Sequence, residues 1–170
     1  MTETFTLYKL SVLYMLKKVD FPLTTSQISE FILDKGYTTY FKLQGALAEM
    51  VDSGLLKAET THNRTLYHLT ENGDETIQFF TNKISPAIQK DINEFFKEKR
   101  YELKEEVAIK SDYYLNTNHE YEVRCQIVEN GFSLIDLKLT VPTEVEAETI
   151  ANNWNGQSQD IYASLLTQLL

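Results

Sequence analysis

The chain has 170 residues, of which 42% are hydrophobic and 24% charged, an ordinary composition for a globular protein that excludes bulk disorder. Its single cysteine, Cys125, excludes an internal disulfide and a cysteine-rich zinc site. The net charge is −9, and even residues 1–80 carry 7 Lys and Arg against 10 Asp and Glu, so the surplus of cations that usually dominates DNA affinity is missing.

Two helices are predicted at the start of the chain. Residues 5–19 are rich in apolar side chains, with a stripe at Tyr8, Val12, Leu13 and Leu16, and Pro22 follows the end of this helix. Thr24 and Gln27 have the spacing of a capping box, which predicts the start of a second, short helix. Its buried face should consist of Ile28, Phe31 and Ile32, and Gly36 should end it.

A third helix is predicted to begin after Thr38 as its N-cap and to end before Ser53-Gly54. Its apolar residues have the i, i+4, i+7, i+8 spacing of one helical face, namely Leu43, Leu47, Met50 and Val51. These residues should point into a core. The opposite face, which should lie in solvent, consists of Thr38, Phe41, Lys42, Gly45, Ala48, Glu49 and Asp52.

A β-hairpin and a fourth helix follow. Two extended segments, residues 55–60 and 65–70, flank the polar stretch Thr61-His62-Asn63-Arg64, which is typical of a hairpin tip. Thr70 should then cap a helix that continues through Ile77, Phe79 and Phe80.

Ser85-Pro86 predicts the start of a long amphipathic helix, with Ser as the N-cap and Pro at the first helical position. The helix should run to about residue 104, and its apolar stripe is Ile88, Ile92, Phe95, Phe96 and Leu103. This stripe has two interpretations. It packs on its own domain, or it pairs with a second subunit, and we favour the second.

The last third changes to an alternation of apolar and polar residues, which predicts three antiparallel strands with one wet face. A three-residue loop of Glu129, Asn130 and Gly131 would keep apolar residues opposite apolar ones, with Cys125 facing Ile135 and Val123 facing Leu137. Gly131 should then be left-handed and form a bulge.

Two helices are predicted to cover the apolar face of this sheet. The first begins with a capping box of Thr143 and Glu146. Its stripe is Ala147, Ile150, Ala151 and Trp154. Asn155-Gly156 should end it, and a separate last helix should contribute Ile161, Leu165 and Leu169.

Two stretches carry a resemblance to known proteins. Residues 24–56, TTSQISEFILDKGYTTYFKLQGALAEMVDSGLL, look like a helix-turn-helix leading into a wing, and residues 66–73, LYHLTENG, look like the end of the wing. In both, the chain resembles PadR- and MarR-type winged-helix transcriptional regulators. The whole chain also resembles an uncharacterised family of bacterial winged-helix proteins, a domain of unknown function.

The expected fold is therefore α+β. A winged helix-turn-helix domain spans residues 1–82, a connecting and dimerisation helix spans residues 83–104, and residues 105–170 form a three-stranded antiparallel sheet covered by two helices.

The resemblance implies a homodimeric regulator that reads double-stranded DNA with its third helix and wing. The residues in the matching positions are Tyr37, Thr38, Thr39, Phe41, Lys42, His62, Asn63 and Arg64. The outward face of the third helix has one cation, two anions and no Arg, Asn or Gln, so it equally suits a protein partner centred on Phe41, Gly45 and Ala48. A structural or ligand-sensing role, with an effector bound by the C-terminal module, stays open.

Other functions are not indicated by the residues. The three histidines, His62, His68 and His119, lack the spacing of a metal site, and no catalytic motif or cofactor motif occurs, so we expect a protein that is not an enzyme. No secretion signal and no stretch of ~18 apolar residues is visible. We therefore expect a cytoplasmic protein that does not cross a membrane.

Overall fold

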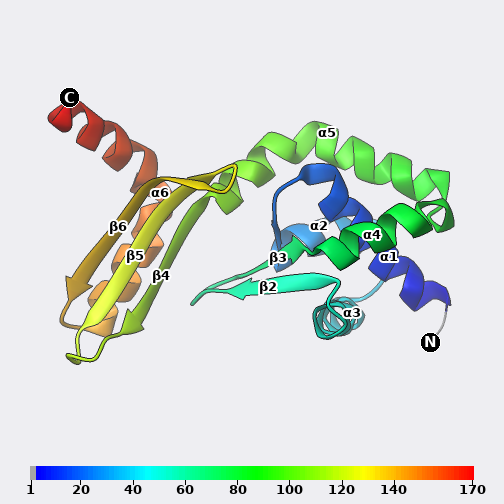
Figure 1. The fold of residues 1–170 in the computed structure, drawn as a ribbon, viewed down its shortest axis with the longest axis horizontal. Helices are drawn as coiled ribbons and strands as arrows, with labels where there is room; N and C mark the ends of the chain where they lie inside the picture. Colours follow the sequence, from blue (N-terminus) through cyan, green and yellow to red (C-terminus); the bar gives the residue numbers. More distant parts are fainter. Residues whose placement is uncertain (1–2) are drawn as a thin grey trace. The chain divides into compact units, whose positions relative to one another are not determined.

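The computed structural model describes residues 3–170, with side chains from residue 7 onward. Over this range it contains six α-helices, one short 3-10 helix and two three-stranded antiparallel sheets (Figure 1). The chain divides into two compact units, Met1–Lys104 and Glu105–Leu170, and each unit has its own hydrophobic core. The predicted α+β class is confirmed.

The first unit is built from helices and a small sheet in which β3 lies between β1 and β2. Its elements in chain order are α1 (Glu3–Val19), β1 (Leu23–Thr24), α2 (Thr25–Asp34), α3 (Tyr40–Asp52), β2 (Leu56–Thr60), β3 (Thr65–Leu69), α4 (Glu71–Phe80), η1 (Thr81–Lys83) and the greater part of α5 (Pro86–Ala108). The two-residue strand β1 was not expected from the sequence, because two residues are too short to show any periodicity.

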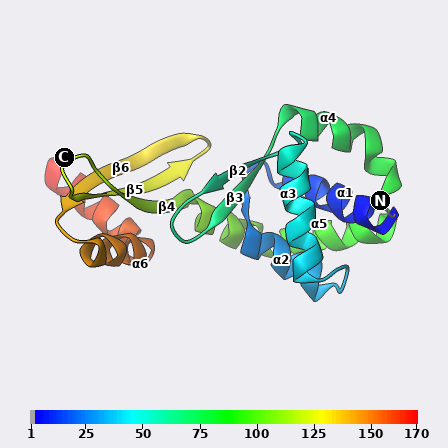
Figure 2. The same ribbon diagram turned by 90° about the horizontal axis from the view of Figure 1, so that it is seen from below.

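α1 is the central helix of the first unit. It contacts α3, α4 and β3, and Figure 2 shows α3 crossing it. Its described part is buried on almost every side, at Leu10, Val12, Leu13, Tyr14, Met15, Leu16 and Val19. The predicted stripe is confirmed at Val12, Leu13 and Leu16, whereas Tyr8 is only half-buried. Phe5, where the predicted helix begins, has a side chain outside the described residues.

Local capping signals explain where most of these helices begin. Thr24 and Gln27 form the predicted capping box of α2 through two hydrogen bonds of 3.0 Å. The prediction that Thr38 caps α3 is wrong, because the hydroxyl of Thr39 accepts the hydrogen bond from the N–H of Lys42 at 3.3 Å. Both residues are threonines, so the sequence pattern could not separate them.

The motif LTENG joins the hairpin to α4. The Thr70 hydroxyl accepts from the N–H of Gly73 at 3.0 Å and donates to the carbonyls of Gly54 and Leu55, at 2.6 and 2.9 Å. A Cβ on Gly73 would lie 2.2 Å from the Leu55 carbonyl oxygen, so only glycine fits this close approach. Threonine and glycine in this motif therefore hold the start of α4 against the end of the turn after α3.

The apolar stripe of α5 is used within the first unit. Ile92, Phe96 and Leu103 belong to the core of this unit and are at most 5% exposed. The Gln27 side-chain amide, also buried, donates to the Leu103 carbonyl at 3.1 Å. Of the two interpretations of the stripe, the structure supports packing on its own unit. A homodimer stays a prediction and would need another surface. The helix also ends at Ala108, beyond the predicted residue 104.

The second unit is an antiparallel sheet with one covering helix. β4 (Ile109–Leu115), β5 (Tyr121–Glu129) and β6 (Phe132–Val141) follow one another in that spatial order, and α6 (Glu144–Leu169) lies on one face. The predicted alternation is confirmed on β5, where Val123, Cys125 and Ile127 are at most 2% exposed. Burial raises the pKa of the Cys125 thiol to about 11, so it packs as a neutral side chain.

The prediction of a three-residue loop between β5 and β6 is wrong. Glu129 pairs with Phe132, so Asn130 and Gly131 form a two-residue turn, in which both have positive φ (50° and 82°), as a type I′ turn requires. Gly131 is thus left-handed, as predicted. The bulge lies instead at Leu134, because Val128 pairs with Ser133 and Ile127 with Ile135.

This extra residue in β6, and not a longer loop, restores the pairing of apolar with apolar side chains. Cys125 lies opposite Leu137, and Val123 lies opposite Leu139. Each partner is two residues further along β6 than predicted.

The prediction of two covering helices is also wrong, because α6 is a single helix of 26 residues that continues through Asn155-Gly156. Trp154 and Ser158 are buried at i and i+4, and Ile161 packs against the same core, so one face is continuous across the glycine. The Trp154 indole N–H also donates to the Gln126 carbonyl at 3.0 Å. These contacts with the sheet outweigh the turn preference of the Asn-Gly pair.

The continuity of α6 leads to a prediction about Gly156. Its Cβ position is open, with nothing within 4 Å, and its φ is not positive. Gly156→Ala should therefore raise the free energy of unfolding by about 0.5–1 kcal/mol, as glycine-to-alanine changes in helix interiors do. The matched control is Gly131→Ala, which should lower it because φ is positive. Urea denaturation measures both, and destabilisation by Gly156→Ala would contradict the single helix.

Candidate nucleic-acid interface

One side of α3 is anchored in the core of the first unit. Leu43, Leu47 and Met50 are fully buried, and Val51 is half-buried against the same cluster. The predicted inward face is confirmed. Ala46, which was not predicted, is fully buried as well. The rotation of α3 about its own axis is therefore set by burial on this side.

The opposite side of α3 is exposed. Phe41 is 87% exposed and Tyr40, beside it at the start of the helix, is 57% exposed. The other exposed residues on this side are Lys42, Gly45, Ala48, Glu49 and Asp52, as predicted. Among the described residues of the first unit, Phe41 is the most exposed of the large hydrophobic side chains.

The charge of this face is less acidic than the sequence suggests. The Lys9 ammonium of α1 lies 2.7 Å from the Glu49 carboxylate. This ion pair offsets one of the two anions, and Lys42 and Asp52 remain on the same face. Lys9 was not predicted to lie near this face, because a pairing across 40 residues leaves no local pattern in the sequence.

The two threonines at the start of α3 differ in their contacts and exposure. Thr39 caps the helix, as described above, and it is exposed. The hydroxyl oxygen of Thr38 is buried, with no hydrogen-bond partner among the residues that the structure describes. Thr39 is thus more accessible to a ligand than Thr38.

Tyr37 has a structural contact. Its hydroxyl donates to the Asp91 carboxylate of α5 at 2.9 Å, and its ring packs edge-on against Phe31. Burial and this hydrogen bond raise the pKa of Tyr37 to about 12. The structure therefore holds this phenol against α5 and keeps it neutral at ordinary pH.

The β2–β3 hairpin is the second part of the candidate interface. Its tip is closed by a hydrogen bond of 2.9 Å from the N–H of Thr61 to the carbonyl of Arg64, and Thr60 pairs with Thr65. Asn63 is exposed at the tip, whereas His62 and Arg64 are half-buried. Lower on the hairpin, His68 Nε2 lies 2.8 Å from the Glu59 carboxylate, a contact that the sequence did not predict.

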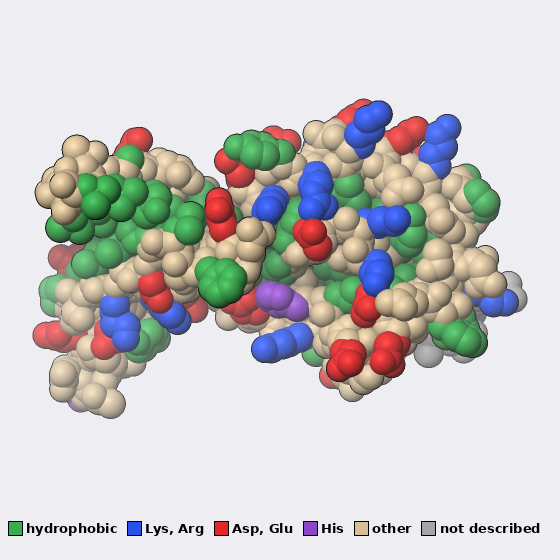
Figure 3. All heavy atoms as spheres, turned by 45° about the horizontal axis from the view of Figure 1, so that its top comes forward, with side chains coloured by type: hydrophobic (Ala, Val, Ile, Leu, Met, Phe, Trp, Pro, Cys, Tyr) green, Lys and Arg blue, Asp and Glu red, His purple; other side chains and the backbone are tan. Residues whose placement is uncertain are grey.

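On the face drawn in Figure 3, Lys and Arg side chains of the first unit, at right, are interspersed with Asp and Glu. No group of three or more His, Cys, Asp and Glu side chains that could hold a metal ion occurs in the described part of the chain. Among residues 3–170, no helix is both long enough and apolar enough to cross a membrane.

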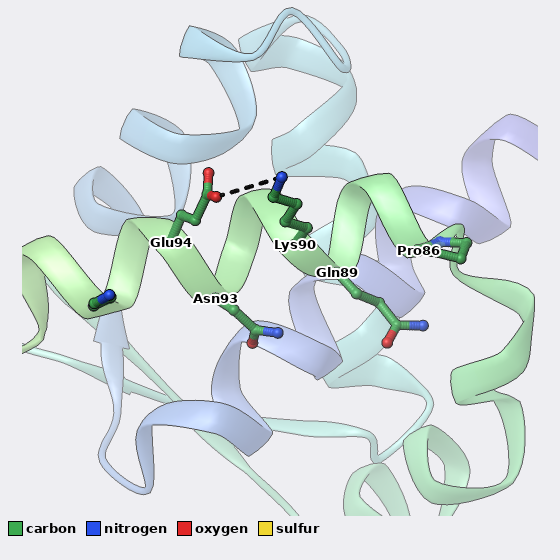
Figure 4. A pocket seen from close by; sticks show the side chains of 6 residues that line it. Pro86, Gln89, Lys90, Asn93 and Glu94 are labelled. Atoms are coloured by element: carbon green, nitrogen blue, oxygen red, sulfur yellow. Dashed lines mark ion pairs between the residues drawn. The ribbon is translucent and has the colours of Figure 1, made fainter.

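A hollow of about 360 Å³ lies along α5 and is lined by Pro86, Gln89, Lys90, Asn93, Glu94 and Lys97 (Figure 4). Four of its polar side chains, Gln89, Lys90, Asn93 and Glu94, already have partners. Lys90 and Glu94 form an ion pair of 3.9 Å, and the Gln89 amide donates to the Ile84 carbonyl at 2.9 Å. The Asn93 side-chain oxygen accepts from the Tyr14 hydroxyl at 3.3 Å. Because a single helix lines this open hollow, it lacks the enclosed, convergent lining of a ligand pocket.

Comparison with known proteins identifies the family but no named relative. A family model described as a domain of unknown function (DUF4364) matches residues 8–169. No curated protein gives a significant match. No solved structure does so either. The resemblance to PadR- and MarR-type regulators therefore stays a prediction. Since the family match covers nearly the whole sequence, the chain belongs to the DUF4364 family.

Proposed function

We propose that residues 1–82 are a winged-helix domain that binds double-stranded DNA through α3 and the β2–β3 hairpin, in the role of a transcriptional regulator. The order of helices and strands and the antiparallel order β1-β3-β2 support this assignment. The observation that carries it is the division of α3 into a fully buried side and an exposed side that begins at Tyr40, Phe41 and Lys42.

The proposed contacts divide into two groups. The exposed N-terminal turn of α3 carries the positive end of the helix dipole, which favours a phosphate. Lys42 lies on this turn and reaches toward phosphate or base edges, and the exposed Thr39 adds a hydroxyl. At the hairpin tip, Asn63 and Arg64 contact the backbone or the minor groove.

The proposed interface has few cations, so each one should contribute measurably to DNA affinity. The Lys9–Glu49 ion pair reduces the repulsion that Glu49 would exert on DNA. Even so, Lys42 and Arg64 are the only predicted contacts with a permanent positive charge. We therefore propose modest affinity that falls with salt.

The first test removes these charges. Lys42→Ala and Arg64→Ala should each weaken binding to a mixed-sequence duplex, and each should lower the slope of log affinity against log salt by about 1, because one phosphate contact is lost. Fluorescence anisotropy with a labelled duplex at several salt concentrations measures both. The control is Lys90→Ala on α5, whose side chain is 75% exposed and should not matter. Equal affinity in all four proteins would contradict the proposal.

A second test asks whether Tyr37 contacts DNA or only stabilises the fold. Because its hydroxyl is bonded to Asp91, Tyr37→Phe should leave DNA binding unchanged and lower the free energy of unfolding by about 1 kcal/mol, since the pair is partly solvated. The pKa of Tyr37 is higher in the folded chain than in the unfolded chain, so its contact stabilises the fold fully below pH 10. The difference between the two proteins should therefore shrink as the pH rises from 10 to about 12. Loss of DNA binding in Tyr37→Phe would instead make the phenol a contact.

One observation favours a second function. Phe41 is 87% exposed, and a Cβ on Gly45 would meet nothing within 4 Å, so α3 presents an apolar ring beside an open, small-residue surface. Such a surface suits the helix of a protein partner. The alternative proposal is therefore a protein-binding winged helix centred on Phe41, Gly45 and Ala48.

This alternative has its own test. Ala48→Glu should abolish capture of a partner from cell extract, because it buries a carboxylate at the centre of the contact, while moderate salt should have little effect. Quantitative mass spectrometry of the captured proteins is the measurement. Ala87→Glu, the same change at an exposed position of α5, is the control. A partner retained equally by both variants would rule out this use of α3.

A further inference from the structure

β6 is a free edge of the sheet in the second unit. In the strand order β4-β5-β6 it pairs with β5 on one side, and no strand within the described residues pairs with its other side. At ten residues it is the longest strand of this sheet. A long edge strand presents unpaired backbone N–H and C=O groups, which are a template for another strand.

The apolar face of β6 is also less covered than that of its neighbour. Val123 and Cys125 on β5 are at most 1% exposed, whereas Leu139, opposite Val123, is 45% exposed. Hydrogen bonds tie α6 to the other two strands, from the Ser111 hydroxyl to the Ala151 carbonyl and from Trp154 to Gln126. Figure 1 shows α6 along one face of the sheet and β6 as one of its edge strands.

We propose that β6 pairs antiparallel with β6 of a second copy of this chain, about a two-fold axis perpendicular to the sheet. The result is a six-stranded sheet with both α6 helices on the same face, and the half-covered residues of β6 lie between them. This interface is separate from α3 and does not depend on DNA binding.

The charges of β6 favour one register, in which opposite charges face each other. A perpendicular two-fold axis keeps each side chain on its own face, so apolar residues of one copy must lie opposite apolar residues of the other. Centring the pairing on Leu137 places Lys138 opposite the partner's Asp136, twice by symmetry, and Ile135 opposite the partner's Leu139. Centring it on residue 136 or 138 would instead oppose two aspartates or two lysines. The edge is therefore complementary to itself in the register that also matches its apolar residues.

The position of Lys138 beside β5 suits a contact with the partner's Asp136. Lys138 lies directly opposite Arg124 of β5, a like-charged pair, and its nearest carboxylate, on Glu122, is 3.7 Å away. Asp136 is held in a fixed orientation by a bidentate bond with Arg124, at 3.0 and 2.8 Å. The Asp136 of its own chain is held by Arg124, so the partner's Asp136 would give Lys138 a directly opposed carboxylate in addition to Glu122.

A lysine on an edge strand usually prevents such pairing, because its charge would be buried beside an arbitrary strand. In β6, Lys138 instead favours a partner strand that places an aspartate directly opposite it, as a second β6 does in the register centred on Leu137. The bulge at Leu134 confines the regular pairing to residues after it, from Ile135 onward. The interface is thus short and specific.

The test is the oligomeric state of the full chain by sedimentation velocity over a concentration series. The wild type should reach twice the chain mass of 19.7 kDa. Lys138→Asp and Asp136→Lys should each weaken dimerisation by about tenfold or more, because like charges then face each other. Mixing the two variants should restore a heterodimer, since aspartate of one again faces lysine of the other. The control is Lys90→Asp on α5, which should dimerise as the wild type does.

Folding of each variant is checked by circular dichroism. Leu139→Lys provides an independent variant on the apolar face, because Leu139 is already 45% exposed and its loss should not unfold the chain. It should also dissociate the dimer, whereas Phe79→Lys, at a 78% exposed position of α4, should not. A monomeric wild type at all concentrations would overturn the proposal. So would a dimer that both β6 charge variants leave intact, or variants that fail to form a heterodimer.

Discussion

The fully buried side of α3 is the constraint on which the candidate interface depends. Leu43, Leu47 and Met50 are each 0% exposed, so any rotation of the helix would expose apolar side chains and bury polar ones. The exposed position of Lys42 is therefore a consequence of core packing. The same packing leaves Phe41 in solvent, which is why one surface supports two candidate functions.

A second constraint fixes the position of α4, which follows the β2–β3 hairpin, against the turn after α3. Thr70 bonds to two carbonyls in the turn after α3, and Gly73 allows the start of α4 to approach Leu55 more closely than any side chain would permit. Both residues belong to the LTENG motif, which carried the resemblance to winged-helix regulators. The motif thus has a structural explanation, and its presence does not by itself indicate what α3 binds.

Helical spacing was predicted well from a few neighbouring residues, whereas the exact cap of α3, the length of the β5–β6 turn and the contacts between distant residues were not. The inward face of α3 and the capping boxes of α2 and α6 follow from spacing alone. The two Asn-Gly pairs show the limit: Asn130-Gly131 forms a turn, whereas Asn155-Gly156 lies within a helix held by Trp154. The Lys9–Glu49 and Tyr37–Asp91 contacts join distant segments, so the site's charge and the role of Tyr37 required the folded chain.

The two units differ in how completely they cover their own apolar residues. The α5 stripe looked like a dimer surface in the sequence, but Ile92, Phe96 and Leu103 complete the core of the first unit. In the second unit, α6 buries β5 and leaves Leu139 of β6 at 45% exposure beside unpaired backbone. Amphipathic pattern alone cannot distinguish these cases, because it predicts that a face will be covered and not which element covers it. We therefore place the proposed self-association at the β6 edge, where the fold leaves both apolar surface and backbone hydrogen-bonding groups available among the described residues.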